Sequence, residues 1–73
     1  EITMADNYNG TATCKVKLPS GDTRDVSCSI AGIYNTEFDA KSALQVKLEG
    51  AVSASSGTKV DGSVSLSVSI SGN

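Results

Sequence analysis

The segment Cys14-Lys-Val-Lys-Leu-Pro-Ser-Gly-Asp-Thr-Arg-Asp-Val-Ser-Cys28 contains both cysteines and the only proline of the chain. Apolar and polar residues alternate on each side of its centre, which is typical of half-buried strands. The residues at the centre favour a turn, because proline presets φ and glycine tolerates positive φ. We therefore predict a β-hairpin with strands at 11–18 and 24–30.

Two registers fit this hairpin. If Cys14 faces Cys28, Lys17 lies opposite Asp25, an opposite-charge pair worth about 0.2–1 kcal/mol. If the loop is only Pro19-Ser20-Gly21, Cys14 faces Val26 and the cysteines become diagonal neighbours. We favour the wider loop, or a bulge that reconciles the two, because of the charge pair.

The two cysteines share one face of the predicted hairpin, which places them within bridging distance. We expect a Cys14–Cys28 disulfide, which would contribute about 3 kcal/mol by closing a loop of about 15 residues. The alternative is a pair of reduced thiols that act as small core residues. The chain has no histidine and no Cys-x-x-Cys, so we expect neither a redox site nor a zinc site.

The 73 residues are expected to form one domain spanning 1–73, with a core of small aliphatic residues because only 4% of the chain is aromatic. The net charge is −2, and the basic residues are dispersed, which argues against a nucleic-acid partner. No apolar run is long enough to predict a transmembrane segment. The abundance of serine and threonine, together with the expected disulfide, favours a secreted, periplasmic or cell-surface protein.

Two stretches are ambiguous. Residues 1–10 suit either a frayed terminus or a short edge strand, and Asn7-Tyr8-Asn9-Gly10 resembles a turn. Residues 36–50 suit a helix that Thr36 would cap, but Leu44, Val46 and Leu48 also alternate as in a strand. We favour a loop or single helical turn at 36–41, followed by a strand at 42–55 that is broken at Gly50.

The most regular alternation is Ser63-Val-Ser-Leu-Ser-Val-Ser-Ile-Ser71, with its apolar residues on one face and serines on the other. We expect it to pair antiparallel with 43–54 in a second hairpin. Its serine face lacks the charges that usually protect an exposed strand, so we expect this strand to be internal to a sheet or covered by a partner. The predicted fold is all-β: a small antiparallel β-sandwich or flattened barrel of two packed hairpins, with 4–6 strands and one disulfide.

No catalytic constellation is visible in the sequence, since the usual general base, histidine, is missing. Glu37 and Asp39 are expected to be solvated acids rather than a metal site, and no cofactor or metal is expected. The stretch Thr11-Ala-Thr-Cys-Lys-Val-Lys-Leu-Pro-Ser-Gly-Asp-Thr23 resembles small extracytoplasmic lipoprotein domains of bacteria, over less than a third of the chain. The resemblance implies export and assigns no role to any residue.

These observations favour a non-catalytic module that binds another protein, and two alternatives remain open. One is an enzyme inhibitor or effector that presents the hairpin loop, formed by Leu18, Pro19, Ser20, Gly21, Asp22, Thr23 and Arg24. The other is a structural subunit that self-associates through the terminal strand, whose outward serines are Ser63, Ser65, Ser67 and Ser69.

Overall fold

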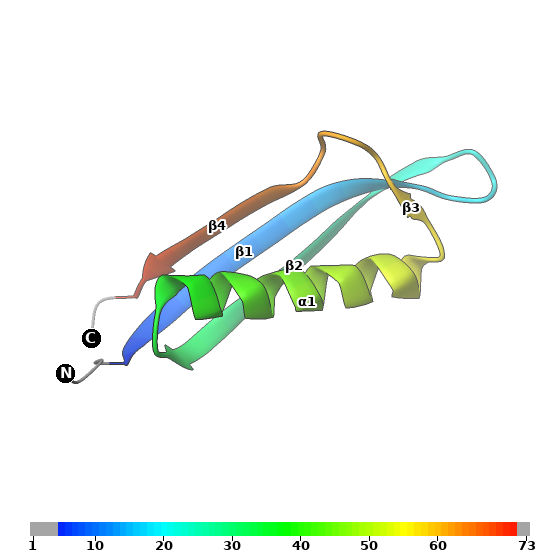
Figure 1. Cartoon of the computed structure of the whole chain (residues 1–73). Helices are drawn as coiled ribbons and strands as arrows, with labels where there is room; N and C mark the ends of the chain where they lie inside the picture. Colours follow the sequence, from blue (N-terminus) through cyan, green and yellow to red (C-terminus); the bar gives the residue numbers. More distant parts are fainter. Residues whose placement is uncertain (1–4, 72–73) are drawn as a thin grey trace.

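The computed structural model describes residues 5–71 and shows a single antiparallel sheet covered on one face by one helix (Figure 1). The elements in chain order are β1 (Asp6–Lys17), β2 (Thr23–Tyr34), α1 (Glu37–Ser55), β3 (Thr58–Lys59) and β4 (Ser65–Ile70). Strand β1 is central, with β2 along one side and both β3 and β4 along the other. The molecule is therefore mostly β but not all-β, and the predicted two-hairpin sandwich or barrel is wrong.

The first hairpin is confirmed, but in the tighter register. Cys14 faces Val26 and Lys17 faces Thr23, and the Leu18 N–H donates to the Asp22 carbonyl over 2.8 Å. Gly21 has a φ of 97° and donates its N–H to the Leu18 carbonyl, which is the arrangement of a three-residue hairpin loop that ends in a left-handed glycine. The wider register is wrong because this turn decides the pairing.

Asp25 still faces a lysine in the observed register, but this lysine is Lys15 and not the predicted Lys17. Lys15 lies opposite Asp25, and its Nζ is 3.1 Å from the Asp25 carboxylate. Both side chains are exposed, so the pair contributes little to stability. An exposed pair of this kind contributes too little free energy to set the register against the preference of the turn residues.

Strand β1 begins earlier than predicted and runs through the residues interpreted as a turn. Residues 1–4 of the predicted terminal strand or frayed end lie outside the described residues, whereas Asp6 to Gly10 pair with β2. Gly10 is needed for packing rather than for a turn. A Cβ at this position would lie only 3.0 Å from side-chain atoms of Leu44 and Val68, so the helix approaches β1 closely here.

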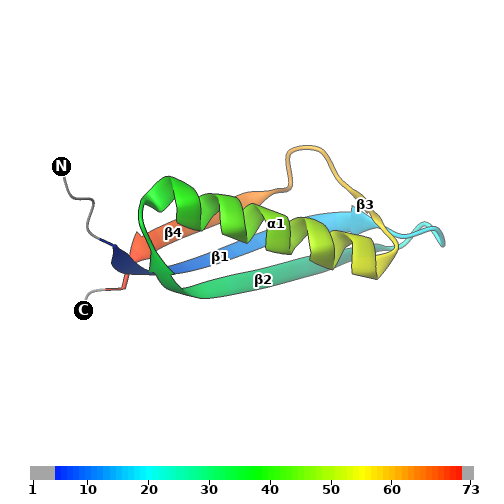
Figure 2. The same ribbon diagram turned by 60° about the horizontal axis from the view of Figure 1, so that its bottom comes forward.

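The strand predicted at 42–55 is wrong, because this segment forms α1 (Figure 2). Thr36 caps the helix: its hydroxyl accepts the Asp39 N–H over 3.1 Å, which satisfies one of the free donors of the first turn. The helix passes through Gly50 and ends at Ser55, and the capping residue Ser56 has a left-handed φ of 63°. One face buries residues spaced four apart, namely Ala40, Leu44, Leu48 and Val52.

The last strand is confirmed over Ser65–Ile70, but its predicted partner is wrong. It pairs antiparallel with β1, with Ala12 opposite Leu66 and Gly10 opposite Val68. The core lies between this sheet and α1 and consists of the four buried helix residues together with Tyr8, Ala12, Cys14, Val16 and Ile30. Because β4 has no second strand neighbour among the described residues, it forms one edge of the sheet, and β2 forms the other.

Candidate docking edge

The outer edge of β4 has unpaired backbone groups. In an antiparallel pair, both the N–H and the C=O of one residue point to the same neighbour, and the direction alternates along the strand. The Ser71 N–H donates to the Asn7 carbonyl over 2.9 Å, so the serines of β4 point their backbone groups toward β1. The backbone groups of Leu66, Val68 and Ile70 therefore point outward, and within residues 5–71 no strand pairs with this side of β4 and no other backbone hydrogen bond reaches it.

The opposite edge of the sheet is protected. The same alternation directs the backbone of Ser29 away from β1, and the Lys47 ammonium of α1 donates to the Ser29 carbonyl over 2.9 Å. This edge also carries Arg24 and Asp25, and charged side chains are a common device against unwanted strand pairing. Between Ser63 and Ser71, by contrast, there is no charged residue. The two edges of the sheet are thus chemically different, and β4 is the unprotected one.

An apolar groove runs between β4 and α1. The helix lies mainly over β2 and β1 and contacts β4 less than either of them, because one helix is about 10 Å wide and two strand spacings already equal about 10 Å. The resulting groove has a volume of about 420 Å³ and is lined on its apolar side by Val46, Leu48, Val64 and Leu66. Ile70, farther along the same face of β4, is 57% exposed.

One ion pair lies in this groove. The Lys59 ammonium contacts the Glu49 carboxylate, and the hydrogen bond and charge of Glu49 raise the pKa of Lys59 above its usual value of 10.5. The pair is exposed, and its charges compensate each other. The groove therefore combines apolar side chains with one ion pair whose net charge is zero.

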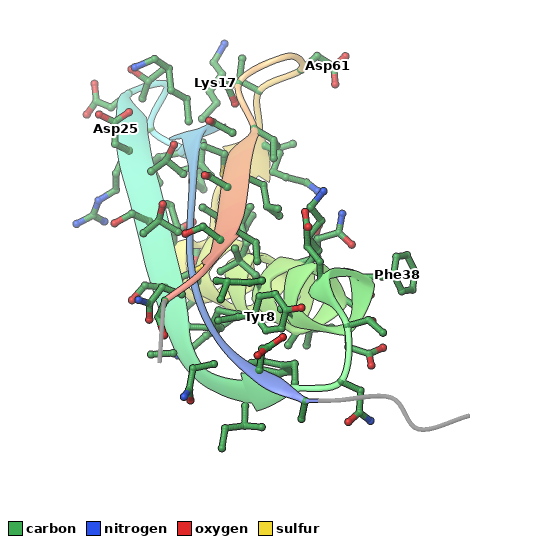
Figure 3. The ribbon with its side chains drawn as sticks, turned by 90° about the vertical axis from the view of Figure 1, so that its left-hand side faces the viewer. Tyr8, Lys17, Asp25, Phe38 and Asp61 are labelled. Carbon is green, nitrogen blue, oxygen red and sulfur yellow. The ribbon has the colours of Figure 1, made fainter. Side chains whose placement is uncertain are left out.

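A second apolar feature belongs to α1 alone. Phe38, in the first turn of the helix, is 75% exposed and points away from the sheet (Figure 3). It does not line the groove. We therefore treat the groove with the outward backbone of β4 as one surface, called the β4 edge, and exclude Phe38 from it.

The structure brings three of the four predicted interaction serines together on the outer face of the sheet. Ser65, Ser67 and Ser69 lie opposite Thr13, Thr11 and Asn9 on β1, and Ser27 and Ser29 continue the polar rows on β2. Ser63 lies apart from this array: its hydroxyl accepts the Lys15 N–H over 3.0 Å, which is a structural role. The serine strand is thus an edge with one hydroxyl face. Of the two predicted positions, internal to a sheet or covered by a partner, the internal one is wrong.

The predicted interaction loop lies at the far tip of the β1–β2 hairpin, beyond the end of α1 (Figures 1 and 2). Pro19 to Arg24 are exposed, but Leu18 is half-buried and packs against the core. Leu18 is therefore a structural residue, and it is poorly placed to enter a partner's pocket.

The predicted disulfide is absent, since Cys14 and Cys28 are both free thiols. In the observed register Cys14 faces Val26 and Cys28 faces Ala12, so the cysteines are diagonal rather than opposite. Cys14 is buried in the core, and the Cys28 thiol lies 3.9 Å from the Leu44 carbonyl, to which it donates. Both cysteines pack the sheet against the helix, which is the alternative role considered above.

Within residues 5–71, no group of three or more acidic, cysteine or histidine side chains is placed to hold a metal ion. In the same range there is no helix with the length and apolar character needed to cross a membrane. Comparisons with family models, curated proteins and solved structures found no match. The case for function therefore depends on the surface of the molecule.

Sequence reasoning missed the groove and the protected β2 edge. Both depend on α1, for which the favoured prediction was a loop or single helical turn followed by a strand, with a helix as the alternative. A signal for the helix was present in the spacing of Ala40, Leu44, Leu48 and Val52, together with Thr36 as a capping residue. The contact of Lys47 with Ser29 has no local signal, because it joins residues that are distant in the chain.

Proposed function

We propose that this chain is a small non-catalytic module of an exported protein, and that it binds a partner protein by adding a strand to the β4 edge. In strand addition, backbone hydrogen bonds supply affinity, and pockets for alternate side chains supply specificity. The β4 edge offers both elements: the outward backbone of Leu66, Val68 and Ile70, and an apolar groove beside them. The observation that carries the proposal is the contrast between this uncharged edge and the β2 edge, which carries Arg24 and Asp25 and whose Ser29 carbonyl is bonded to Lys47.

The expected ligand is an extended segment with small or aliphatic residues at alternate positions. Those residues would lie over the groove near Val46 and Leu66, while the intervening residues would continue the polar outer face. A strongly charged segment is disfavoured, because desolvating a charge against apolar side chains is costly. The serine- and threonine-rich composition supports export. The free cysteines do not, since an expected disulfide was the other ground for it.

The test is a screen of the full chain against a library of neutral nine-residue peptides, with bound peptides mapped by NMR amide shifts. The expected shifts are centred on Leu66, Val68 and Ile70. Ser67→Lys places a charge on the edge strand and should weaken binding at least tenfold. Ser27→Lys makes the same change on the same sheet face but on β2, and should change binding less than twofold.

Two results would contradict the proposal. One is peptide binding that Ser67→Lys leaves intact. The other is binding that maps to residues 19–24 and is lost in Arg24→Ala, which would favour the inhibitor or effector alternative instead. That alternative has one observation in its favour, the protrusion of the hairpin tip beyond α1.

A further inference from the structure

We propose that the strand added to the β4 edge is β4 of a second copy, and that the chain forms a weak symmetric dimer centred on Val68. This inference rests on the proposed function, since it names the partner of the same edge. It starts from a property of β4 itself: the strand alternates serine with aliphatic residues and carries no charge over its whole length.

The symmetry follows from the geometry of an antiparallel pair. A two-fold axis perpendicular to the sheet relates two antiparallel copies of the same edge strand, and such an axis keeps both helices on the same side of the joined sheet. Because α1 lies mainly over β2 and β1, the helices flank the new strand pair without colliding. The same operation leaves the polar outer faces of the two sheets continuous.

The register follows from the direction of the backbone groups. Only Leu66, Val68 and Ile70 point outward, so these residues must face one another across the dimer. An axis through Val68 places Leu66 opposite Ile70 of the second copy and pairs all three. It also places aliphatic side chains opposite aliphatic ones and Ser67 opposite Ser69.

Charge compatibility selects β4 over β2 for this contact. In a symmetric interface each charge near the axis approaches its own copy, which is unfavourable. The β2 edge carries Arg24 and Asp25, and its Ser29 carbonyl is already bonded to Lys47. The β4 edge has neither obstacle.

The size of the contact determines how strong the dimer is. Strand β4 is six residues long, whereas stable interfaces use about 20–30 residues on each side. The dimer is therefore weak. It closes on itself because the other edge of each sheet carries Arg24 and Asp25, and because Lys47 occupies the Ser29 carbonyl there. This conclusion favours a discrete dimer over an open polymer.

The test is analytical ultracentrifugation of the full chain from micromolar to millimolar concentration, with two variants at the axis. Val68→Pro removes an outward N–H but no hydrogen bond to β1, and proline is tolerated on a strand edge in that orientation. Val68→Ala is the matched control, since it loses a similar amount of side-chain packing but keeps the N–H. We expect reversible dimerisation, weakened at least tenfold more by Val68→Pro than by Val68→Ala, with both variants folded by NMR.

The register is tested on a mixed, differentially labelled sample. Facing residues that do not exchange hydrogen bonds bring their α-protons close together, so an intermolecular contact between the Ser67 and Ser69 α-protons is expected. A dimer without this contact would overturn the assignment. A chain that stays monomeric at millimolar concentration would also overturn the second copy as partner. If the chain stays monomeric but binds peptides at the β4 edge, the proposed function is supported and only the dimer is refuted. If it neither dimerises nor binds peptides there, the proposed function and the dimer are both refuted.

Discussion

The replacement of Leu44 by alanine, compared with the same replacement at Val46, tests how α1 packs on the sheet. Leu44 is fully buried, with 0% exposure, whereas Val46 is 73% exposed two residues later. In a helix these two residues lie on opposite sides, but in the strand that the sequence suggested they would share a face. The two arrangements therefore predict different outcomes for the pair of variants.

The magnitudes follow from burial. Leu44→Ala removes three carbon atoms, and at about 0.8 kcal/mol per buried CH₂ the lost transfer free energy is about 2.4 kcal/mol. The space left beneath the helix adds a cavity cost, which brings the total to about 3–5 kcal/mol. Val46→Ala removes two carbon atoms that are mostly in water already, at a cost of about 0.4 kcal/mol. The higher helix propensity of alanine offsets this cost, since valine is less favourable by up to about 0.7 kcal/mol.

The assay is urea unfolding and thermal melting followed by circular dichroism. For a domain of this size, each kcal/mol shifts Tm by about 4–8 °C, so Leu44→Ala should lower Tm by more than about 10 °C and Val46→Ala by almost nothing. If Leu44→Ala fails to fold, Leu44→Val gives a milder comparison at about 1 kcal/mol. Equal destabilisation by the alanine variants at Leu44 and Val46 would refute the helix packing.

Further predictions concern two glycines, the helix cap, one ion pair and the two cysteines. Gly57→Ala should destabilise the protein, because the new Cβ would lie 2.8 Å from Val16. Gly50→Ala meets open space within the helix and should stabilise by about 0.5–1 kcal/mol; equal urea midpoints for the two variants would contradict this account. Thr36→Ala should cost about 1 kcal/mol by removing the helix cap, whereas Thr36→Ser should cost much less; unfolding free energies decide this point. Glu49 raises the pKa of Lys59 above its usual value of 10.5, so the ion pair between them stabilises the fold. This stabilisation is fully present at a pH just below 10.5, and it is lost as the pH rises through the higher pKa that Lys59 has in the folded state. Between neutral and alkaline pH, the stability difference between the protein and Lys59→Gln should shrink in urea titrations only above the usual value of 10.5. A difference that has already disappeared near neutral pH would argue against this expectation. The intact mass should be the same with and without reductant, and a gain of two hydrogen atoms on reduction would show a disulfide.

The hairpin and the last strand could be predicted from sequence because their alternation is local. Alternation failed in α1 for a specific reason: residues four apart always share parity, so Ala40, Leu44, Leu48 and Val52 fit a strand pattern as well as a helix stripe. Val46 appeared to complete the strand pattern, but it faces solvent. Apolar residues repeated every four positions over several turns, with a capping residue before them, predicted the helix better than the alternation predicted a strand.

The register and the candidate site were harder to predict, for different reasons. The register depended on whether the turn at Gly21 or a charge pair decides the pairing, and a turn requiring positive φ outweighs an exposed ion pair. The β4 edge depends on which strand pairs with β1 and on where α1 lies, and both are contacts between distant parts of the chain. The hydroxyl face of the last strand was visible in the sequence, but its position at the edge of the sheet was not.

Amide hydrogen exchange along β4, measured on dilute protein, shows directly whether the outer edge of this strand is open. An open edge gives an alternating pattern, in which the amides of Ser67 and Ser69, bonded to β1, exchange slowly and those of Leu66, Val68 and Ile70 exchange rapidly. Uniformly slow exchange along the strand at low concentration would contradict it, because the outer edge of β4 would then already be paired or covered.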